Sequence, residues 1–319
     1  APRHEVMMVV DGEAARALGD LARERWRRGA GDVVAPPEDA GGDPWPDHVP
    51  PALTDVEIGI ARTVPAWKRQ PEVDEIRRLT LASIAKAKDT IYLENQYFTS
   101  PLVTEALAAR LGEPDGPQVV LVSTGHAPSW FDHLTMDRAR GAMIWRLRAA
   151  DIFGRFRAFW PATAHGKTVI VHSKTSVFDD RIARVGSANL NNRSGGFDTE
   201  CELAIDLGEA TAGNEDARRT IAAFRDRLVG HFMGLTGDAV AKASLDHGGL
   251  VGAIDVLNRD GRLQPIEPPH VTGFGEFVAK YHLGDPEDPK DSWNPIRRRE
   301  RLYQAVRDMQ VLQAPEGEA

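Results

Sequence analysis

Hydrophobic and polar residues follow two periods along this chain, and each period indicates one kind of secondary structure. Alternating or short apolar runs predict strands over 5–10, 56–63, 90–98, 118–123, 168–178, 182–187 and 200–207. Apolar positions three and four apart predict helices over 12–28, 72–88, 102–111, 129–150 and 216–233. Because the two kinds alternate, the pattern predicts an α/β sandwich in which a mixed β-sheet is flanked by helices on both faces.

Two stretches depart from this alternation and divide the chain into three parts. Residues 29–53 are rich in Gly, Pro and Asp, which predicts a linker or long loop. After residue 235 the pattern weakens to a short helix near 238–243, a Pro-rich stretch over 264–290 and a final helix over 295–311. The expected parts are therefore 1–53, a main unit over 54–235, and a C-terminal appendage over 236–319.

Composition narrows the class of protein. The 319 residues are 42% hydrophobic and 27% charged, which is typical of a globular chain. The net charge of −8 argues against extended binding of nucleic acid, although it leaves room for a local basic pocket. The lone cysteine, Cys201, excludes an internal disulfide and a thiolate metal cluster, and we expect a buried free thiol.

Sequence signals for localisation are weak. No apolar run approaches the ~20 residues that span a bilayer, and the start of the chain does not resemble a signal peptide. We therefore expect a cytoplasmic or peripheral membrane protein. The basic run Arg297–Arg301 is interpreted as a solvated helix face, with attraction to a membrane surface as the minor alternative. The chain lacks an initiator Met, so it could be a fragment whose targeting signal lies upstream.

One segment carries the candidate chemistry. It reads His172-Ser-Lys174, then Asp179, then Gly186-Ser187-Ala-Asn189, which is the pattern HxKxxxxD followed by GSxN. Lys174 offers a positive charge to phosphate oxygens, and Ser187 and Asn189 offer hydrogen bonds that strengthen as negative charge builds. His172 can attack phosphorus or protonate a leaving oxygen, because imidazole titrates near neutral pH.

Strand geometry predicts how these groups meet. Residues two apart in a strand share a face, so His172 and Lys174 should project together while Asp179 points away. On the strand that starts at Glu200, this carboxylate and Glu202 share a face, and a carboxylate there could orient an imidazole. Taken singly, His172 would be read as a core histidine and Lys174 as a solvated edge residue, but the complete string favours a phosphate site.

At these residues the sequence resembles the phospholipase D superfamily. Glu200, eleven positions after Asn189, matches the family's downstream acidic residue, and Ile91–Phe98 is similar to a strand that precedes the family's second motif. The resemblance covers residues 1 to about 235. It implies phosphodiester cleavage without a metal or other cofactor, through a phosphohistidine on one His, with a second His as general acid. It also implies that Asp179 is mainly structural.

The chain departs from the family pattern because it contains a single HxKxxxxD motif. Its first thirty residues resemble the segment that follows the first motif in two-motif enzymes. We therefore expect the C-terminal catalytic half of a two-motif enzyme, with residues 1–53 as the end of the preceding half plus a linker. The alternative is that two copies pair, as in the single-motif nucleases of the superfamily.

The resemblance implies hydrolysis of phospholipids or transfer of their phosphatidyl group. Tyr97 and Trp130 are candidates for lining the substrate site, although aromatic residues at such positions are often plain core. Three other functions stay open: a cardiolipin-synthase-type phosphatidyltransferase, which the lack of membrane helices disfavours, a phosphodiesterase or nuclease active as a homodimer, and a phosphate-binding half that is inactive alone.

Overall fold

The structure, a computed structural model, describes residues 1–38, 41–43, 45–126 and 133–267, and positions 281, 284–286, 296, 300, 303, 304, 307 and 308. Its strands are β1 (Arg3–His4), β2 (Gly59–Val64), β3 (Val73–Asp74), β4 (Thr90–Glu94), β5 (Gln118–Val122), β6 (Phe156–Pro161), β7 (Ile170–Val171), β8 (Thr175–Phe178), β9 (Ile182–Gly186), β10 (Glu200–Asp206) and β11 (Leu263–Pro265). Its helices are α1 (Gly12–Ala30), α2 (Glu75–Lys86), α3 (Pro101–Leu111), α5 (Arg138–Ala150), α6 (Glu215–Met233), α7 (Gly237–Asp246) and α8 (Leu250–Leu257), with π-helical turns η1 (His133–Asp137) and η2 (Arg193–Phe197).

A nine-stranded sheet forms the centre of the described chain, in the order β11-β6-β5-β4-β8-β9-β10-β2-β3. Strands β4, β5 and β6 run parallel, and the pairs β4–β8, β8–β9 and β9–β10 are antiparallel. The sheet is therefore mixed. Its central strands read as apolar runs because both of their faces are covered.

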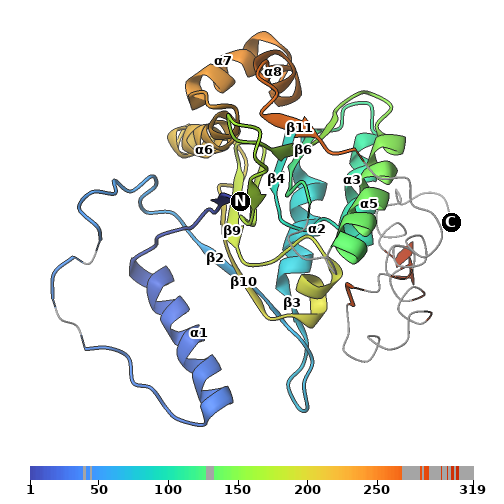
Figure 1. Cartoon of the computed structure of the whole chain (residues 1–319). Coiled ribbons are helices and arrows are strands. Elements are labelled where there is room, and N and C mark those ends of the chain that lie inside the picture. Colours follow the sequence, from blue (N-terminus) through green and yellow to red (C-terminus); the bar gives the residue numbers. More distant parts are fainter. Residues whose placement is uncertain are drawn as a thin grey trace.

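Alternation along the central strands divides the core into two layers. On β4, Ile91 and Leu93 point to one face and Tyr92 to the other. The first face packs against α2, α3 and α5, and the second packs against α6, α7 and α8. Figure 1 shows these two groups of helices on opposite sides of the sheet. The predicted mixed sheet with helices on both faces is confirmed.

The predicted strand over 168–178 is wrong in one important respect. The chain forms β7 and β8 with a break between them, and the break holds His172, Ser173 and Lys174. β7 pairs with β1 in a separate two-stranded sheet, whereas β8 joins the main sheet between β4 and β9. The change of partner removes the regular ladder at the motif, which places the motif between two sheets.

Other predicted elements shift in length. Strand β4 ends at Glu94 rather than at Phe98, the strand β6 was not predicted, and residues 5–10 form no ladder. These six residues nevertheless alternate between exposed and partly buried positions. The long helix expected from Ser129 begins as η1 and α5, and Ser129 itself lies outside the described residues.

The C-terminal part is less separate than we expected. We predicted an appendage beyond residue 235, but β11 pairs with β6 in the main sheet, and Val240, Leu250 and Ile254 join the core on the α6 face. Buried Asp285 also accepts the N–H of Asn192 at 2.9 Å. Apolar side chains at helical spacing in α7 and α8 account for this integration. The helix predicted over 295–311 lies largely outside the described residues.

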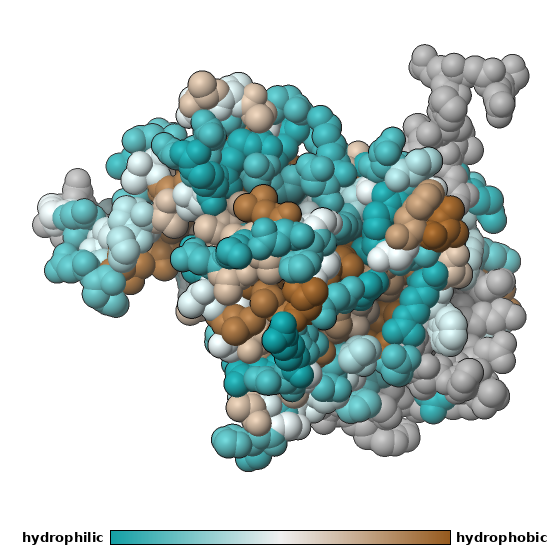
Figure 2. All heavy atoms as spheres, turned by 90° about the horizontal axis from the view of Figure 1, so that it is seen from above, coloured by the Kyte–Doolittle hydropathy of each residue, from teal (hydrophilic) through white to brown (hydrophobic). Residues whose placement is uncertain are grey.

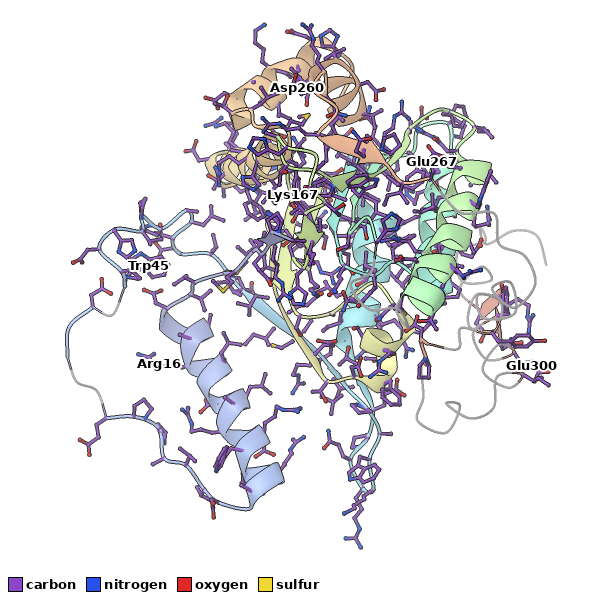
Figure 3. All side chains as sticks on the ribbon, in the orientation of Figure 1. Arg16, Trp45, Lys167, Asp260, Glu267 and Glu300 are labelled. Atoms are coloured by element: carbon purple, nitrogen blue, oxygen red, sulfur yellow. The ribbon has the colours of Figure 1, made fainter. Side chains whose placement is uncertain are left out.

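Helix α1 stands apart from the sheet. None of its residues is buried, and Figures 1 and 3 show it standing away from the other helices, with side chains such as Arg16 projecting into open space. Figure 2 looks onto the α7–α8 end and shows a mostly hydrophilic face interrupted by separate hydrophobic patches.

Candidate active site

The N-terminal strand holds the motif segment in place. The carbonyl oxygen of His4 accepts the backbone N–H of His172 at 2.9 Å and that of Ser173 at 3.2 Å. These bonds extend the pairing of β1 with β7 by one step beyond the last strand residue. The backbone on both sides of His172 is therefore fixed although the residue lies outside a strand.

Glu5 contacts the imidazole of His172. Its Oε1 lies 2.7 Å from Nδ1, an ion-pair distance at which the alignment falls short of a formed hydrogen bond. Nδ1 is buried, while 37% of the His172 side chain is exposed. The exposed part of the ring therefore lies away from Nδ1. A carboxylate beside Nδ1 favours the tautomer that leaves Nε2 unprotonated and free to attack.

Glu5 is a candidate site residue that the sequence did not reveal. We expected Glu200 to orient an imidazole, and in the described chain the carboxylate beside His172 is Glu5. The signal was present, because residues 1–30 resemble the segment that follows the first family motif and Glu5 lies in it. A contact across about 170 residues of sequence cannot be read from spacing alone.

Lys174 is buried beside His172. Only 8% of the residue is exposed, and its Nζ donates to the carbonyl oxygen of His172 at 2.6 Å and to Oε1 of Gln96 at 3.3 Å. Burial lowers the pKa of Lys174 to about 8, and the carboxylates of Glu5 and Glu200 oppose that shift. The ammonium is therefore charged at neutral pH but close to its titration point.

This pKa gives a testable pH dependence. Below pH 8 the Lys174 side chain is mostly protonated and attracts an anion, and above pH 8 it is mostly neutral. Affinity for sulfate, whose charge is constant in this range, should fall roughly tenfold between pH 7 and pH 9 in a calorimetric titration. Lys174→Arg stays charged and should show a flat profile. A flat profile in the wild-type chain would contradict the assignment.

The GSxN segment lies directly beside Lys174. The N–H of Gly186 donates to the carbonyl oxygen of Lys174 at 3.0 Å. A Cβ at Gly186 would lie 2.6 Å from the carbonyl oxygen of Cys201 on β10, so only glycine allows this close approach of strands. The two halves of the motif therefore meet through backbone contacts.

Glu200 binds hydroxyl groups in the described chain. Its carboxylate accepts hydrogen bonds from Ser187 and, at 2.7 Å, from Ser194. Burial raises the pKa of Glu200, and these two hydroxyls partly offset the effect. Among the described residues, its hydrogen bonds are to these hydroxyls and none is to an imidazole.

Asn189 is the last of the predicted site residues in the motif. Its Oδ1 is buried and has no hydrogen-bond partner among the described residues, and the residue as a whole is half-buried. A buried polar atom without a partner is costly unless a ligand satisfies it or the carboxamide turns to present its NH2 group. The charges of Glu5 and Glu200 act on Lys174, which places the cation close to the partners of His172 and Ser187. That the Asn189 side chain joins the same site stays a prediction.

Comparisons with known proteins point to the same residues. A family model described as "Cardiolipin synthase, PLD-like domain" matches residues 80–216, which include the entire motif. The chain is 27% identical to phospholipase D zeta 2 of Arabidopsis thaliana over 215 residues, which are 53% of this chain and 20% of that protein. These matches support membership in the phospholipase D superfamily.

Two further proteins are similar to parts of this chain. Phospholipase D of Phytophthora infestans is 25% identical over 246 residues, which are 62% of this chain and 14% of that protein. Nuc from Salmonella typhimurium, a phospholipase D family member of known structure, aligns over 47% of this chain and 82% of its own with 19% identity and a TM-score of 0.35. This phospholipase D homologue therefore spans only about a fifth or less of its curated relatives.

In this phospholipase D-like chain, Asp179 binds backbone rather than facing the site. Its carboxylate accepts the N–H groups of Lys88, Asp89 and Thr90 at 2.8 to 3.0 Å, and its own N–H donates to Thr90. Its φ of 56° is left-handed, which Asp tolerates better than most residues. Asp179 therefore joins the β8–β9 turn to the start of β4.

Replacing Asp179 with alanine should reduce stability. The three N–H groups lose their acceptor, and alanine is strained at positive φ, so the free energy of unfolding should fall by about 2 kcal/mol in urea denaturation. Asp180→Ala is the matched control, because its partly exposed pair with Arg218 contributes within about 1 kcal/mol. Equal losses in the two variants would contradict the role of Asp179.

Glu202 does not share the site with Glu200. It lies 6% exposed and forms an ion pair with Arg184, which is 2% exposed and also donates to Thr80 at 2.9 Å. Strand alternation places both carboxylates on one face, as predicted, but β9 supplies an arginine that pairs with Glu202. Cys201 between them is a half-buried free thiol rather than a fully buried one.

The two aromatic candidates have different outcomes. Tyr97 is half-buried, and its hydroxyl oxygen accepts a hydrogen bond from Nε2 of Gln96 at 3.3 Å. Oε1 of the same Gln96 carboxamide accepts a hydrogen bond from Nζ of Lys174. Gln96 therefore links Tyr97 to the ammonium group of Lys174. A role of Tyr97 in binding substrate stays a prediction. Trp130 lies outside the described residues.

In the part of the chain that the structure describes, no helix is long and apolar enough to cross a membrane. No group of three or more His, Cys, Asp or Glu side chains there is arranged to hold a metal ion.

Proposed function

We propose that this chain supplies one half of a phosphodiester-cleaving site, with His172 as nucleophile and Lys174, Ser187 and Asn189 as the phosphate clamp. The contact of Glu5 with Nδ1 of His172 carries the proposal, because it leaves Nε2 as the reactive atom. The alternative is that His172 is an ordinary core histidine, with its ring nitrogens hydrogen-bonded and no catalytic role. Its partly exposed ring beside a buried lysine fits a site better.

The first chemical step follows from these positions. Nε2 of His172 attacks phosphorus and forms an N–P bond, while the bond from phosphorus to the leaving oxygen breaks and its electron pair departs with that oxygen. The imidazole becomes cationic, and Glu5 stabilises it. Lys174 and Asn189 bind the non-bridging oxygens as charge builds on them.

A second imidazole is needed to protonate an alkoxide leaving group in the first step. It is needed again to activate the water or alcohol that cleaves the N–P bond. Glu5 and Glu200 occupy related places, since Glu5 is followed by five residues and Asp11, and Glu200 is followed by five residues and Asp206. Each acidic segment leads into a 19-residue helix, α1 or α6. Because Glu5 contacts an imidazole, Glu200 is the expected partner of the second one, which an upstream half or a second copy would supply.

Phospholipid is the favoured substrate class. The net charge of −8 disfavours long nucleic acids, and the relatives reported above are named phospholipases D. The same covalent intermediate would pass the phosphatidyl group either to water or to an alcohol. Transfer of the cardiolipin-synthase type is the second candidate, because the matching family model bears that description.

A substrate whose leaving group departs without being protonated tests the proposed half-site directly. Bis(4-nitrophenyl) phosphate releases 4-nitrophenolate, which departs as an anion at neutral pH and needs no general acid. The isolated chain should release about one equivalent and then stall, because no second imidazole activates water. Peptide mass spectrometry should find the remaining 4-nitrophenyl phosphoryl group on His172. An adduct elsewhere, or steady release without an adduct, would contradict the proposal.

A further inference from the structure

Three consecutive residues, the last of β4 and the two that follow it, hold both parts of the motif. Glu94, Asn95 and Gln96 are 0%, 3% and 9% exposed, and each contacts a different part of the site. We propose that they are positioning residues, with Glu94 as the principal one. This inference rests on the proposed role of His172 as nucleophile.

Glu94 receives three donors inside the protein. Its Oε1 accepts the hydroxyl of Tyr92 at 2.7 Å, and its Oε2 accepts the hydroxyl of Ser173 at 2.5 Å and lies 2.8 Å from Nε2 of His4. The pKa of Tyr92 is raised well above its usual value by burial and by Glu94, so the phenol stays a donor. A buried acceptor with several donors fixes all of them in place.

The two donors to Oε2 of Glu94 are adjacent in sequence to the two residues of the Glu5–His172 contact. Ser173 follows His172, and His4 precedes Glu5. Because successive side chains of extended backbone point to opposite sides, His4 and Ser173 reach inward to Glu94 while Glu5 and His172 meet on the other side. One carboxyl group therefore ties together the two backbones that carry the imidazole and its carboxylate.

Asn95 does the same for the GSxN segment. Its Oδ1 accepts the N–H of Leu190 at 3.0 Å, and its Nδ2 donates to the carbonyl oxygen of Ala188 at 3.3 Å. Ala188 and Leu190 flank Asn189, so the carboxamide of Asn95 grips the backbone on both sides of that residue. Gln96 contacts the Lys174 ammonium at 3.3 Å. The segment thus fixes imidazole, clamp amide and cation relative to one another.

The tautomer of the His172 imidazole tests the positioning role of Glu94, and its measurement needs no substrate. In a 15N-labelled chain the imidazole shifts of His172 should report mainly the Nδ1–H form. Glu94→Gln replaces an acceptor oxygen with an NH2 group and should shift His172 toward the Nε2–H form that a free histidine prefers. Ser173→Ala should shift it in the same direction, and it decides the matter if Glu94→Gln fails to fold.

Two further variants separate positioning from stability. Tyr92→Phe removes one donor to Glu94 but leaves Ser173 and His4 in place, so the tautomer should not move. Asn95→Asp keeps the acceptor for Leu190 and loses the donor to Ala188, so it should move the side-chain amide signals of Asn189 and not those of His172. A purely structural role would give the same tautomer in every folded variant.

The outcomes are separable from those of the proposed function. A folded Glu94→Gln or Ser173→Ala chain with the wild-type tautomer overturns the positioning role, even if the wild-type chain gives the expected burst of nitrophenolate. A shifted tautomer supports it, even if no phosphodiester is cleaved. Where the burst is observed, Glu94→Gln should slow its rate with little change in the substrate concentration that gives half the maximal rate.

Discussion

Replacing Glu202 with alanine should lower the free energy of unfolding by about 3–5 kcal/mol. The reason is that Arg184 is 2% exposed and keeps its charge when its carboxylate partner is removed. The remaining bond to the Thr80 hydroxyl cannot neutralise a buried guanidinium. Urea denaturation followed by circular dichroism measures the loss.

The matched control for this variant is a surface pair of the same chemistry. Glu215 and Arg219 on α6 are 68% and 64% exposed, so Glu215→Ala should change stability by no more than about 0.5 kcal/mol. A double variant, Glu202→Met with Arg184→Met, should recover much of the loss, because an apolar pair leaves no buried charge. A loss below about 1 kcal/mol in Glu202→Ala would show that water reaches Arg184.

Replacing His172 with asparagine should reduce phosphodiester turnover by about 10⁴-fold or more in a preparation that contains a second motif. Asparagine cannot form the covalent intermediate, whereas Lys174 and Asn189 can still bind phosphate. Affinity for sulfate should therefore change little while the rate is lost. Turnover of a short-chain phosphatidylcholine, read as choline released, measures the effect.

His165→Asn serves as the control, since His165 is exposed and belongs to the same stretch of chain. It should keep full activity. A His172→Asn variant that retains more than a tenth of the activity would show that another group attacks phosphorus.

Pattern and motif predicted the frame of the molecule and its principal chemical groups. The apolar runs of β4 and β5 were visible because both faces of those strands are buried. His172, Lys174, Ser187 and Asn189 were predicted as site residues because their spacing is specific to one family, and their roles stay a prediction. The structure places the peptide segments that carry them next to each other, through the bond from Gly186 to Lys174.

Long-range partners were the part that sequence could not supply. Periodicity describes which face a residue occupies, but not which distant residue meets it there. Glu202 was grouped with Glu200 because they share a face of β10, yet Arg184 on the neighbouring strand pairs with Glu202. The break at His172 was missed for a similar reason, since β1 binds that segment from about 170 residues away.

The central claim is that this chain holds half of a catalytic site, and its concentration dependence tests that claim most directly. Choline release from short-chain phosphatidylcholine should be measured over a wide range of chain concentration, with the molecular mass followed by sedimentation. We expect either no steady turnover, or turnover that rises with the square of concentration as dimers form. Steady turnover proportional to concentration, from a chain that stays monomeric and loses activity in His172→Asn, would contradict it.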